Sequence, residues 1–171
     1  IDRGLFHLKD EEKTTYLETK EQIEEWMEQV TTEFKSREVK YHESMNSGQT
    51  LPEFSRVFLF IDGYGRFSQT LGNLLQDRMT TLLKNYSHLG LSIIASGSSN
   101  ELTKGYDPLT VELKQVRQII LLMKKSDQTL INLPFDRKEP DIKAGFAYYV
   151  QSENAQKIQI PLVQIERKVH A

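Results

Sequence analysis

The sequence predicts an α/β fold in which helices cover a mainly parallel sheet. Three apolar runs of strand length, at 57–61, 91–95 and 118–122, follow one another along the chain. Before and between them, segments 20–44 and 66–87 carry apolar residues at helical spacing. Because right-handed crossovers place helices on the faces of a parallel sheet, we expect these two helices to pack on its faces.

Local signals mark the ends of these elements. Thr19 is followed three positions later by Gln22, the capping-box pattern that starts a helix. Gly90 is expected to follow the end of the second long helix, and a short helix is expected to begin near Ser99. Residues 146–160 form two short apolar stretches around a polar turn, which predicts a β-hairpin at one edge of the sheet.

Polar residues follow two of the expected strands. The run 57–61 is apolar throughout, as expected of a parallel strand that is buried on both faces, and Asp62 follows it. Ser96 follows the run 91–95. Because the carboxyl ends of parallel strands meet at one edge, where ligands of such sheets bind, we expect Asp62 and Ser96 to lie at the same edge.

Composition bounds the class of protein. The 171 residues fit one domain, 1–171, with 38% hydrophobic residues and a mean hydropathy of −0.51, as in a globular protein without a membrane span. Lys and Arg number 22 against 24 Asp and Glu, so no basic excess favours nucleic-acid binding. The absence of cysteine excludes disulfides and thiolate metal sites. The chain begins at Ile1, and we expect it to be a fragment of a larger multi-domain chain.

Asp62 permits two interpretations. An acidic residue at such a strand end can hold a magnesium-bound water in a nucleotide-hydrolysing sheet, but it can equally be a turn residue. The next residue is Gly63, which has no carboxylate to orient an attacking water. The glycine-rich Walker A pattern is also absent from the sequence. We therefore assign no catalytic residue.

Other chemistries have less support. Segment 63–68 imitates a dinucleotide fingerprint, but Asp62 would repel a pyrophosphate and Asp77 falls inside a helix, so a Rossmann-like oxidoreductase is a minor alternative. The four histidines share no metal-ligand spacing, and no metal site is expected. An active ATP-hydrolysing motor domain whose P-loop lies upstream stays open as the main alternative to a module without hydrolysis.

Taken together, several segments resemble the FtsK/SpoIIIE-type motor ATPases, and within them the carboxyl-terminal ATPase module of the type VII secretion coupling proteins. The order and spacing of the segments carry this resemblance, which covers the chain from about residue 16. The similar segments are 34–41, 57–62, 89–96, 117–122 with 126–127, 140–150 and 157–161.

The resemblance implies a RecA-like P-loop NTPase fold whose first, P-loop strand is absent from this sequence. It places Asp62 at the Walker B position and Ser96 at the sensor position, as weak nucleotide and Mg²⁺ ligands. Gly63 stands where the family has its catalytic glutamate, and Gly97 stands where a sensor glutamine is frequent. The resemblance therefore implies a degenerate module, in which ATP and Mg²⁺ bind weakly or not at all.

The resemblance also implies partners and a location. The expected partners are neighbouring ATPase modules of the same chain, further copies in a homo-multimer, and secreted small helical proteins. Neither nucleic acid nor direct membrane contact is expected. The chain would be a cytoplasmic domain of a membrane-anchored protein that takes part in protein transport.

Overall fold

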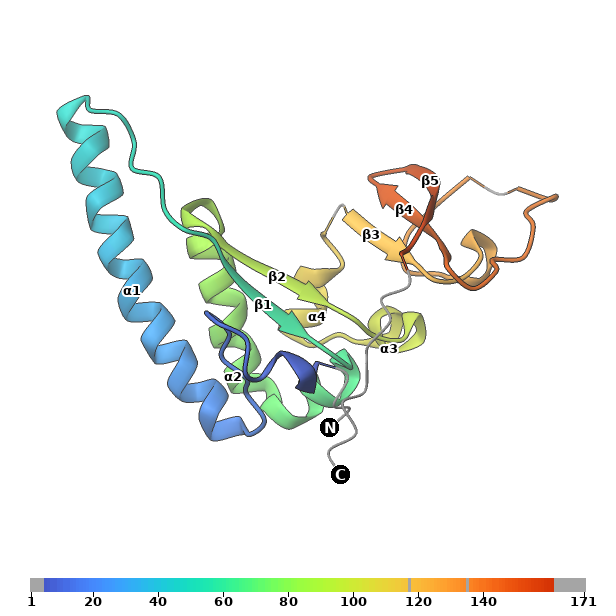
Figure 1. Ribbon diagram of the computed structural model, residues 1–171, viewed down its shortest axis with the longest axis horizontal. Coiled ribbons are helices and arrows are strands. Elements are labelled where there is room, and N and C mark those ends of the chain that lie inside the picture. Colours follow the sequence, from blue (N-terminus) through green and yellow to red (C-terminus); the bar gives the residue numbers. More distant parts are fainter. Residues whose placement is uncertain (1–4, 117, 135, 162–171) are drawn as a thin grey trace. The chain divides into compact units, whose positions relative to one another are not determined.

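The computed structural model describes residues 5–116, 118–134 and 136–161, and these fall into two units that divide between Leu113 and Lys114. Figure 1 labels the elements. The first unit contains α1 (Lys20–Ser47), β1 (Val57–Ile61), α2 (Tyr64–Tyr86), β2 (Leu91–Ala95), α3 (Ser99–Lys104) and α4 (Pro108–Leu113), with 3₁₀ turns at Phe6–Leu8 and Ser87–Leu89. The second contains β3 (Gln118–Leu121), a 3₁₀ turn at Lys125–Asp127, β4 (Phe146–Gln151) and β5 (Asn154–Gln159).

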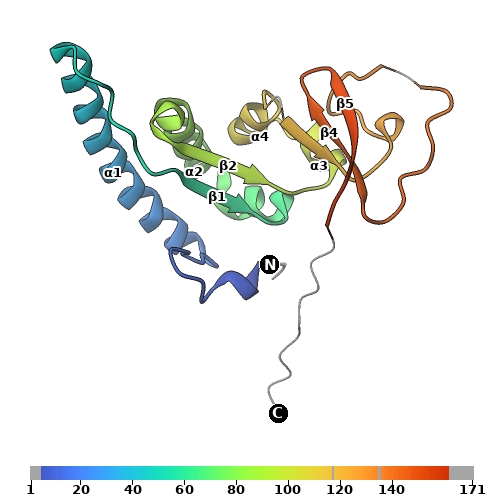
Figure 2. The ribbon, with the colours of Figure 1, turned by 45° about the horizontal axis from the view of Figure 1, so that its top comes forward.

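In the first unit, β1 and β2 form a parallel pair. Their register places Val57 beside Leu91 and Ile61 beside Ala95. The two arrows accordingly point the same way in Figures 1 and 2. This parallel pair, with α2 as the crossover between its strands, confirms the predicted α/β class.

Both long helices form where local signals predict them. Thr19 caps α1, because its hydroxyl accepts a hydrogen bond from the Gln22 amide at 3.3 Å while the Gln22 side chain bonds back to the Thr19 amide at 3.1 Å. Helix α1 ends at Gly48, which adopts a left-handed conformation. Helix α2 begins earlier than predicted and contains a break at Gly72, whose φ of 69° and ψ of 166° are not helical.

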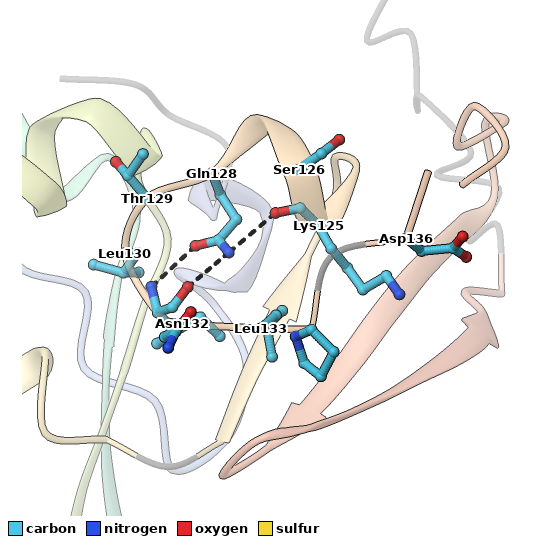
Figure 3. A pocket seen from close by; sticks show the side chains of 10 residues that line it. Lys125, Ser126, Gln128, Thr129, Leu130, Asn132, Leu133 and Asp136 are labelled. Carbon is cyan, nitrogen blue, oxygen red and sulfur yellow. Dashed lines mark hydrogen bonds between the residues drawn. The ribbon is translucent and has the colours of Figure 1, made fainter. Parts of the chain in front are cut away.

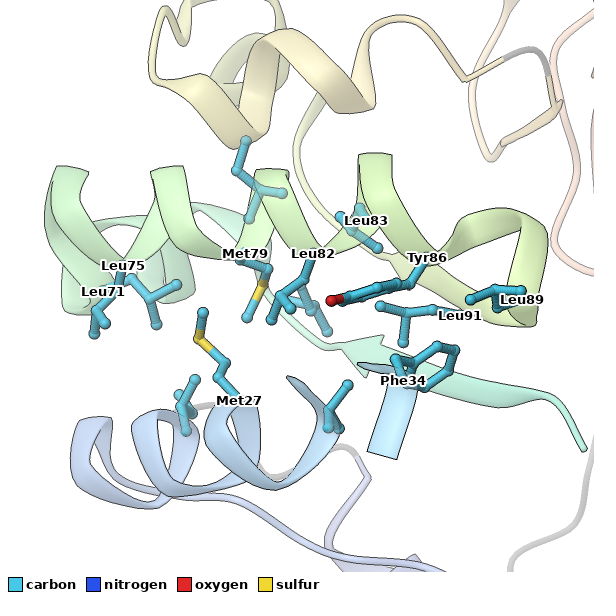
Figure 4. Close-up of a cluster of buried hydrophobic side chains, with 14 of the residues drawn as sticks. Met27, Phe34, Leu71, Leu75, Met79, Leu82, Leu83, Tyr86, Leu89 and Leu91 are labelled. Carbon is cyan, nitrogen blue, oxygen red and sulfur yellow. The ribbon is translucent and has the colours of Figure 1, made fainter. Parts of the chain in front are cut away.

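The core of the first unit lies where α1, α2 and one face of the strand pair meet. In Figure 4, Met27 and Phe34 of α1 point toward Leu75, Met79 and Tyr86 of α2. The apolar spacing in each helix therefore produces one buried stripe on each. The buried members of this core are Ile23, Met27, Val30, Phe34, Ile61, Tyr64, Leu71, Leu75, Met79, Leu82, Leu83, Tyr86, Leu89, Leu91 and Leu109.

The opposite face of the strand pair differs from the expectation for 57–61. Phe58 and Phe60 are 46% and 56% exposed, and Ile94 of β2 is 50% exposed. The expectation that this run is buried on both faces is thus wrong for the described residues. The reason is that Val57, Leu59 and Ile61 point into the core, whereas the alternate residues point away from it.

The second unit corrects the expectation for 118–122. A strand does form there, but β3 pairs antiparallel with β4, so that Ile119 lies opposite Val150 and Leu121 opposite Tyr148. Within the described residues, β3 belongs to a three-stranded sheet with the order β3–β4–β5 and is not a third parallel strand beside β1 and β2. An apolar run indicates a buried strand but carries no information about the direction of its partner.

The predicted hairpin is confirmed as β4 and β5. The two strands pair antiparallel from Phe146 with Gln159 to Gln151 with Asn154, and Ser152 in the turn has a φ of 58°. A small core of Leu121, Tyr148 and Val150 lies on one face of the sheet. Within the described residues the hairpin belongs to this antiparallel sheet, in which β4 is the central strand and β5 an edge strand, so the expected place of the hairpin at an edge of the parallel sheet is wrong.

Candidate functional site at the carboxyl ends of β1 and β2

Asp62 and Ser96 lie together at the carboxyl ends of β1 and β2. The Ser96 hydroxyl donates a hydrogen bond to Asp62 Oδ1 at 2.9 Å. This proximity follows from the parallel register, in which Ile61 and Ala95 are partners and the next residue of each strand reaches the same edge. Their roles as nucleotide and Mg²⁺ ligands remain predictions.

The turn between β1 and α2 is bonded to the end of β2. Gly63 lies in the left-handed region, with φ 73° and ψ 62°, and its amide donates to the Ser96 hydroxyl oxygen at 3.2 Å. The Tyr64 amide donates to the Ser96 carbonyl oxygen at 2.8 Å. The turn therefore leaves β1 in a conformation that glycine adopts without steric cost.

A buried polar group lies directly behind this turn. The Tyr64 side chain is only 2% exposed, and its hydroxyl lies 2.8 Å from the Thr110 hydroxyl and donates to Asp107 Oδ1 at 3.1 Å. Asp107 also accepts the Thr110 amide at 3.0 Å and so caps the N-terminus of α4. These contacts tie the first residue of α2 to the segment that follows α3.

Electrostatics of this group follow from burial and hydrogen bonding. Burial raises the pKa of Tyr64 to about 12, so the phenol stays protonated and can donate. For Asp107, burial acts to raise the pKa, but hydrogen bonds from Thr110 and Tyr64 outweigh it and lower the pKa below its ordinary value. Asp107 is therefore an ionised acceptor and not a candidate general acid at neutral pH.

Sequence reasoning missed Tyr64, Asp107 and Thr110 as a group. The local part had a signal, because Asp107 followed by Pro108 is the pattern of a helix cap with proline at the first helical position. The contact between Asp107 and Tyr64 had no local sequence signal, since these two residues are 43 positions apart. Tyr64 is also the residue next to Gly63, so the group adjoins the predicted Walker B turn.

Glycines allow close packing around the same turn. A Cβ added to Gly65 would lie 2.5 Å from the Glu101 carboxyl carbon, and one added to Gly97 would lie 3.1 Å from Tyr64 Cβ. The segment after β2 therefore packs directly against the first turn of α2. Within the described part of the chain, no group of three or more histidine, aspartate or glutamate residues is placed to hold a metal ion.

A pocket of about 470 Å³ lies along β1, and all five residues of that strand line it. Phe58, Phe60 and Asp62 line it together with Trp26 of α1 and Phe67 of α2. Its lining is mostly apolar and aromatic, but it also includes the cationic residues Lys13, Arg56 and Arg66 and the Asp62 carboxylate.

The second unit has its own pocket, of about 390 Å³, formed by residues of the loop 125–136 (Figure 3). The buried Gln128 side chain organises the loop: its amide nitrogen donates to the carbonyl oxygens of Lys125 and Ile131, and its carbonyl oxygen accepts the Ile131 amide. The Glu139 carboxylate accepts the Lys125 and Ser126 amides at 2.8 and 3.2 Å. The sequence prediction named no site residue in this loop.

No family model matches the chain. A search of curated proteins finds YukB, an ESX secretion system protein of Bacillus subtilis (strain 168), which is 51% identical over 170 residues and 98% of this chain. The chain is homologous to the YukB, EccC and EssC proteins of type VII secretion. EccC of Geobacillus thermodenitrificans (strain NG80-2) is 40% identical over 165 residues and 96% of this chain. The chain spans 11% of the length of each of these two relatives.

Solved structures agree with the homology to EssC. The cytoplasmic domain of EssC superposes with a TM-score of 0.91 and 39% identity, over 96% of this chain and 32% of that one. A structure of EssC ATPases 2 and 3 from Geobacillus thermodenitrificans gives a TM-score of 0.86 at 39% identity, over 96% and 30% of the two chains. The chain therefore has the fold of an EssC ATPase domain. In the residues that the structure describes, no helix is both long and apolar enough to cross a membrane.

Proposed function

We propose that this chain is a degenerate FtsK/SpoIIIE-like ATPase module of a type VII secretion motor, which acts in protein secretion through contacts and not through its own ATP hydrolysis. The partners would be neighbouring ATPase modules of the same chain, further copies in a homo-multimer, and small helical proteins that are secreted. In this proposal the module belongs to the cytoplasmic part of a membrane-anchored complex.

The observation that carries the proposal is the turn after β1. In this proposal Asp62 takes the place of the Walker B aspartate, and Gly63 follows it where the resemblance expects a glutamate. A water that attacks a phosphate needs a positioned acceptor, and Gly63 supplies no side chain for that role. The Asp62 carboxylate accepts a hydrogen bond from the Ser96 hydroxyl, so these two side chains are bonded to each other.

An apolar surface supports the contact role. Phe58, Phe60 and Ile94 lie on the exposed face of the β1–β2 pair, and the rings of the two phenylalanines lie 6.2 Å apart. Clustered apolar side chains on a parallel pair are normally covered. In the longer protein this face can be covered by the upstream part of the same domain or by a neighbouring module, and the proposal assigns it to a neighbouring module.

Removal of the module tests the contact role. When the segment that this chain represents is deleted from the full-length protein, we expect secretion and assembly of the motor to be lost, because the neighbouring modules lose their contact surface. Substrate export and the size of the purified complex are the measurements. As a control, Lys20→Ala at an exposed position of α1 should leave both unchanged. Normal assembly, export and ATP turnover without the module would rule the contact role out.

The main alternative is an active ATPase, and a phosphate-release assay separates the two. The assay uses the full-length protein, because a chain without a P-loop lysine would release no phosphate in either case. We expect Asp62→Ala to leave the rate of phosphate release from ATP unchanged, since position 63 is glycine and this module contributes no hydrolysis. A lower rate in this variant than in the natural protein would favour the active ATPase.

A further inference from the structure

Ser96 commits all its polar groups to the turn between β1 and α2. Its amide donates to the Ile61 carbonyl oxygen at 2.9 Å, and its carbonyl oxygen accepts the Tyr64 amide at 2.8 Å. Its hydroxyl donates to Asp62 Oδ1 at 2.9 Å and accepts the Gly63 amide at 3.2 Å. A sensor residue would need its hydroxyl for a ligand, but here both the donor and an acceptor position of the hydroxyl serve the chain itself.

Gly63 is held in its unusual conformation from both sides. Its amide bonds to the Ser96 hydroxyl, and its carbonyl oxygen accepts the Arg66 and Phe67 amides at 3.1 and 3.3 Å, which starts α2. The φ of 73° lies in the left-handed region, which glycine adopts freely and asparagine tolerates, whereas other L residues pay a steric cost there. The backbone at position 63 therefore favours glycine or asparagine over other residues.

We propose that Asp62, Gly63 and Ser96 form a structural joint that fastens the carboxyl ends of β1 and β2 to the start of α2. The resemblance assigns these three positions to magnesium binding, water activation and sensing. Here they instead hold the strand ends against the start of α2. This inference rests on the proposed function only in identifying position 63 with the missing glutamate. A glutamate placed there pays a steric cost in the left-handed backbone conformation. That cost weakens the hydrogen bond between the amide of residue 63 and Ser96.

Amide hydrogen exchange in the full-length protein tests the joint at the hydroxyl. Ser96→Ala removes the acceptor of the Gly63 amide and the partner of Asp62, so we expect peptides covering residues 60–67 to exchange about tenfold faster. Ser92→Ala, a serine of the same strand outside this group, is the matched control and should leave these peptides unchanged. Equal exchange in the Ser96→Ala variant and the natural protein would overturn the proposal.

Three substitutions at position 63 test the backbone requirement. Gly63→Asn should keep the slow exchange, because asparagine tolerates left-handed geometry, whereas Gly63→Ala and Gly63→Glu should each speed exchange about tenfold. Exchange as slow in Gly63→Ala as in the natural protein would refute the joint. Faster exchange in Gly63→Asn, equal to that in Gly63→Ala, would also refute it, because the loss would then not depend on left-handed geometry.

The two proposals fail independently. Hydrogen exchange reports the joint whether or not any nucleotide is present, so its outcome does not depend on ATP turnover. Phosphate release that depends on Asp62 would overturn the proposed function and leave the exchange results to decide the joint. Unchanged hydrogen exchange would overturn the joint but would not contradict the proposal that the module does not hydrolyse ATP.

Discussion

Replacing Phe34 with alanine should lower the free energy of unfolding of the chain by about 3–5 kcal/mol, the usual cost of emptying a buried phenylalanine site. Phe34 is fully buried at the centre of the core between α1 and α2. Its ring lies 5.5 Å from the Tyr86 ring, and the Arg37 guanidinium lies 4.4 Å from its centre. The substitution removes all these contacts and leaves a cavity between two helices that cannot readily close.

Urea unfolding measures this loss, with fluorescence of Trp26 as the reporter. Trp26 is the single tryptophan of the chain and packs against the same core from α1. Val39→Ala is the matched control, because Val39 lies on the same helix and is 56% exposed. We expect the control to change the free energy of unfolding by less than about 0.5 kcal/mol. A loss for Phe34→Ala no larger than that of the control would show that this core does not form as described.

Replacing Arg37 with alanine should cost about 3 kcal/mol, because the change leaves buried acceptors without a donor. Arg37 is 8% exposed, and its Nη1 donates to the carbonyl oxygens of Ser55 and Leu89 at 2.7 and 3.1 Å. It also pairs with Glu33 through Nη2. One side chain of α1 thus fixes both the segment that enters β1 and the segment that enters β2.

Arg78→Ala is the control for the second prediction. Arg78 lies on α2, is largely exposed and reaches Glu28 at 4.0 Å, so its removal should cost less than about 1 kcal/mol. Arg37→Lys should lie between the two, since an ammonium group cannot reproduce the forked donors or the contact with the Phe34 ring. Equal midpoints of urea unfolding for Arg37→Ala and Arg78→Ala would contradict the role of Arg37 as a buried tie.

The sequence was most informative where a signal is local. The capping box at Thr19 and Gln22, the helical spacing through Phe34 and the apolar runs before Asp62 and Ser96 all lie within a few residues of the element that they predict. Parallel pairing then determines that Asp62 and Ser96 meet, because crossover helices bring carboxyl ends to one edge. The fold class, the two long helices, the hairpin and the adjacency of this pair could therefore be predicted without coordinates.

Tertiary structure alone decided the features that depend on distant partners. The apolar run that forms β3 identifies a strand, but its antiparallel pairing with β4 depends on residues about 30 positions away. The bond from Tyr64 to Asp107 and the left-handed turn at Gly63 depend on how the segment after β2 packs against α2. Local sequence encodes backbone preference and periodicity, whereas packing selects which distant groups meet. For that reason the sequence by itself determined which residues stand at the strand ends, and only the fold decided that they bond to one another.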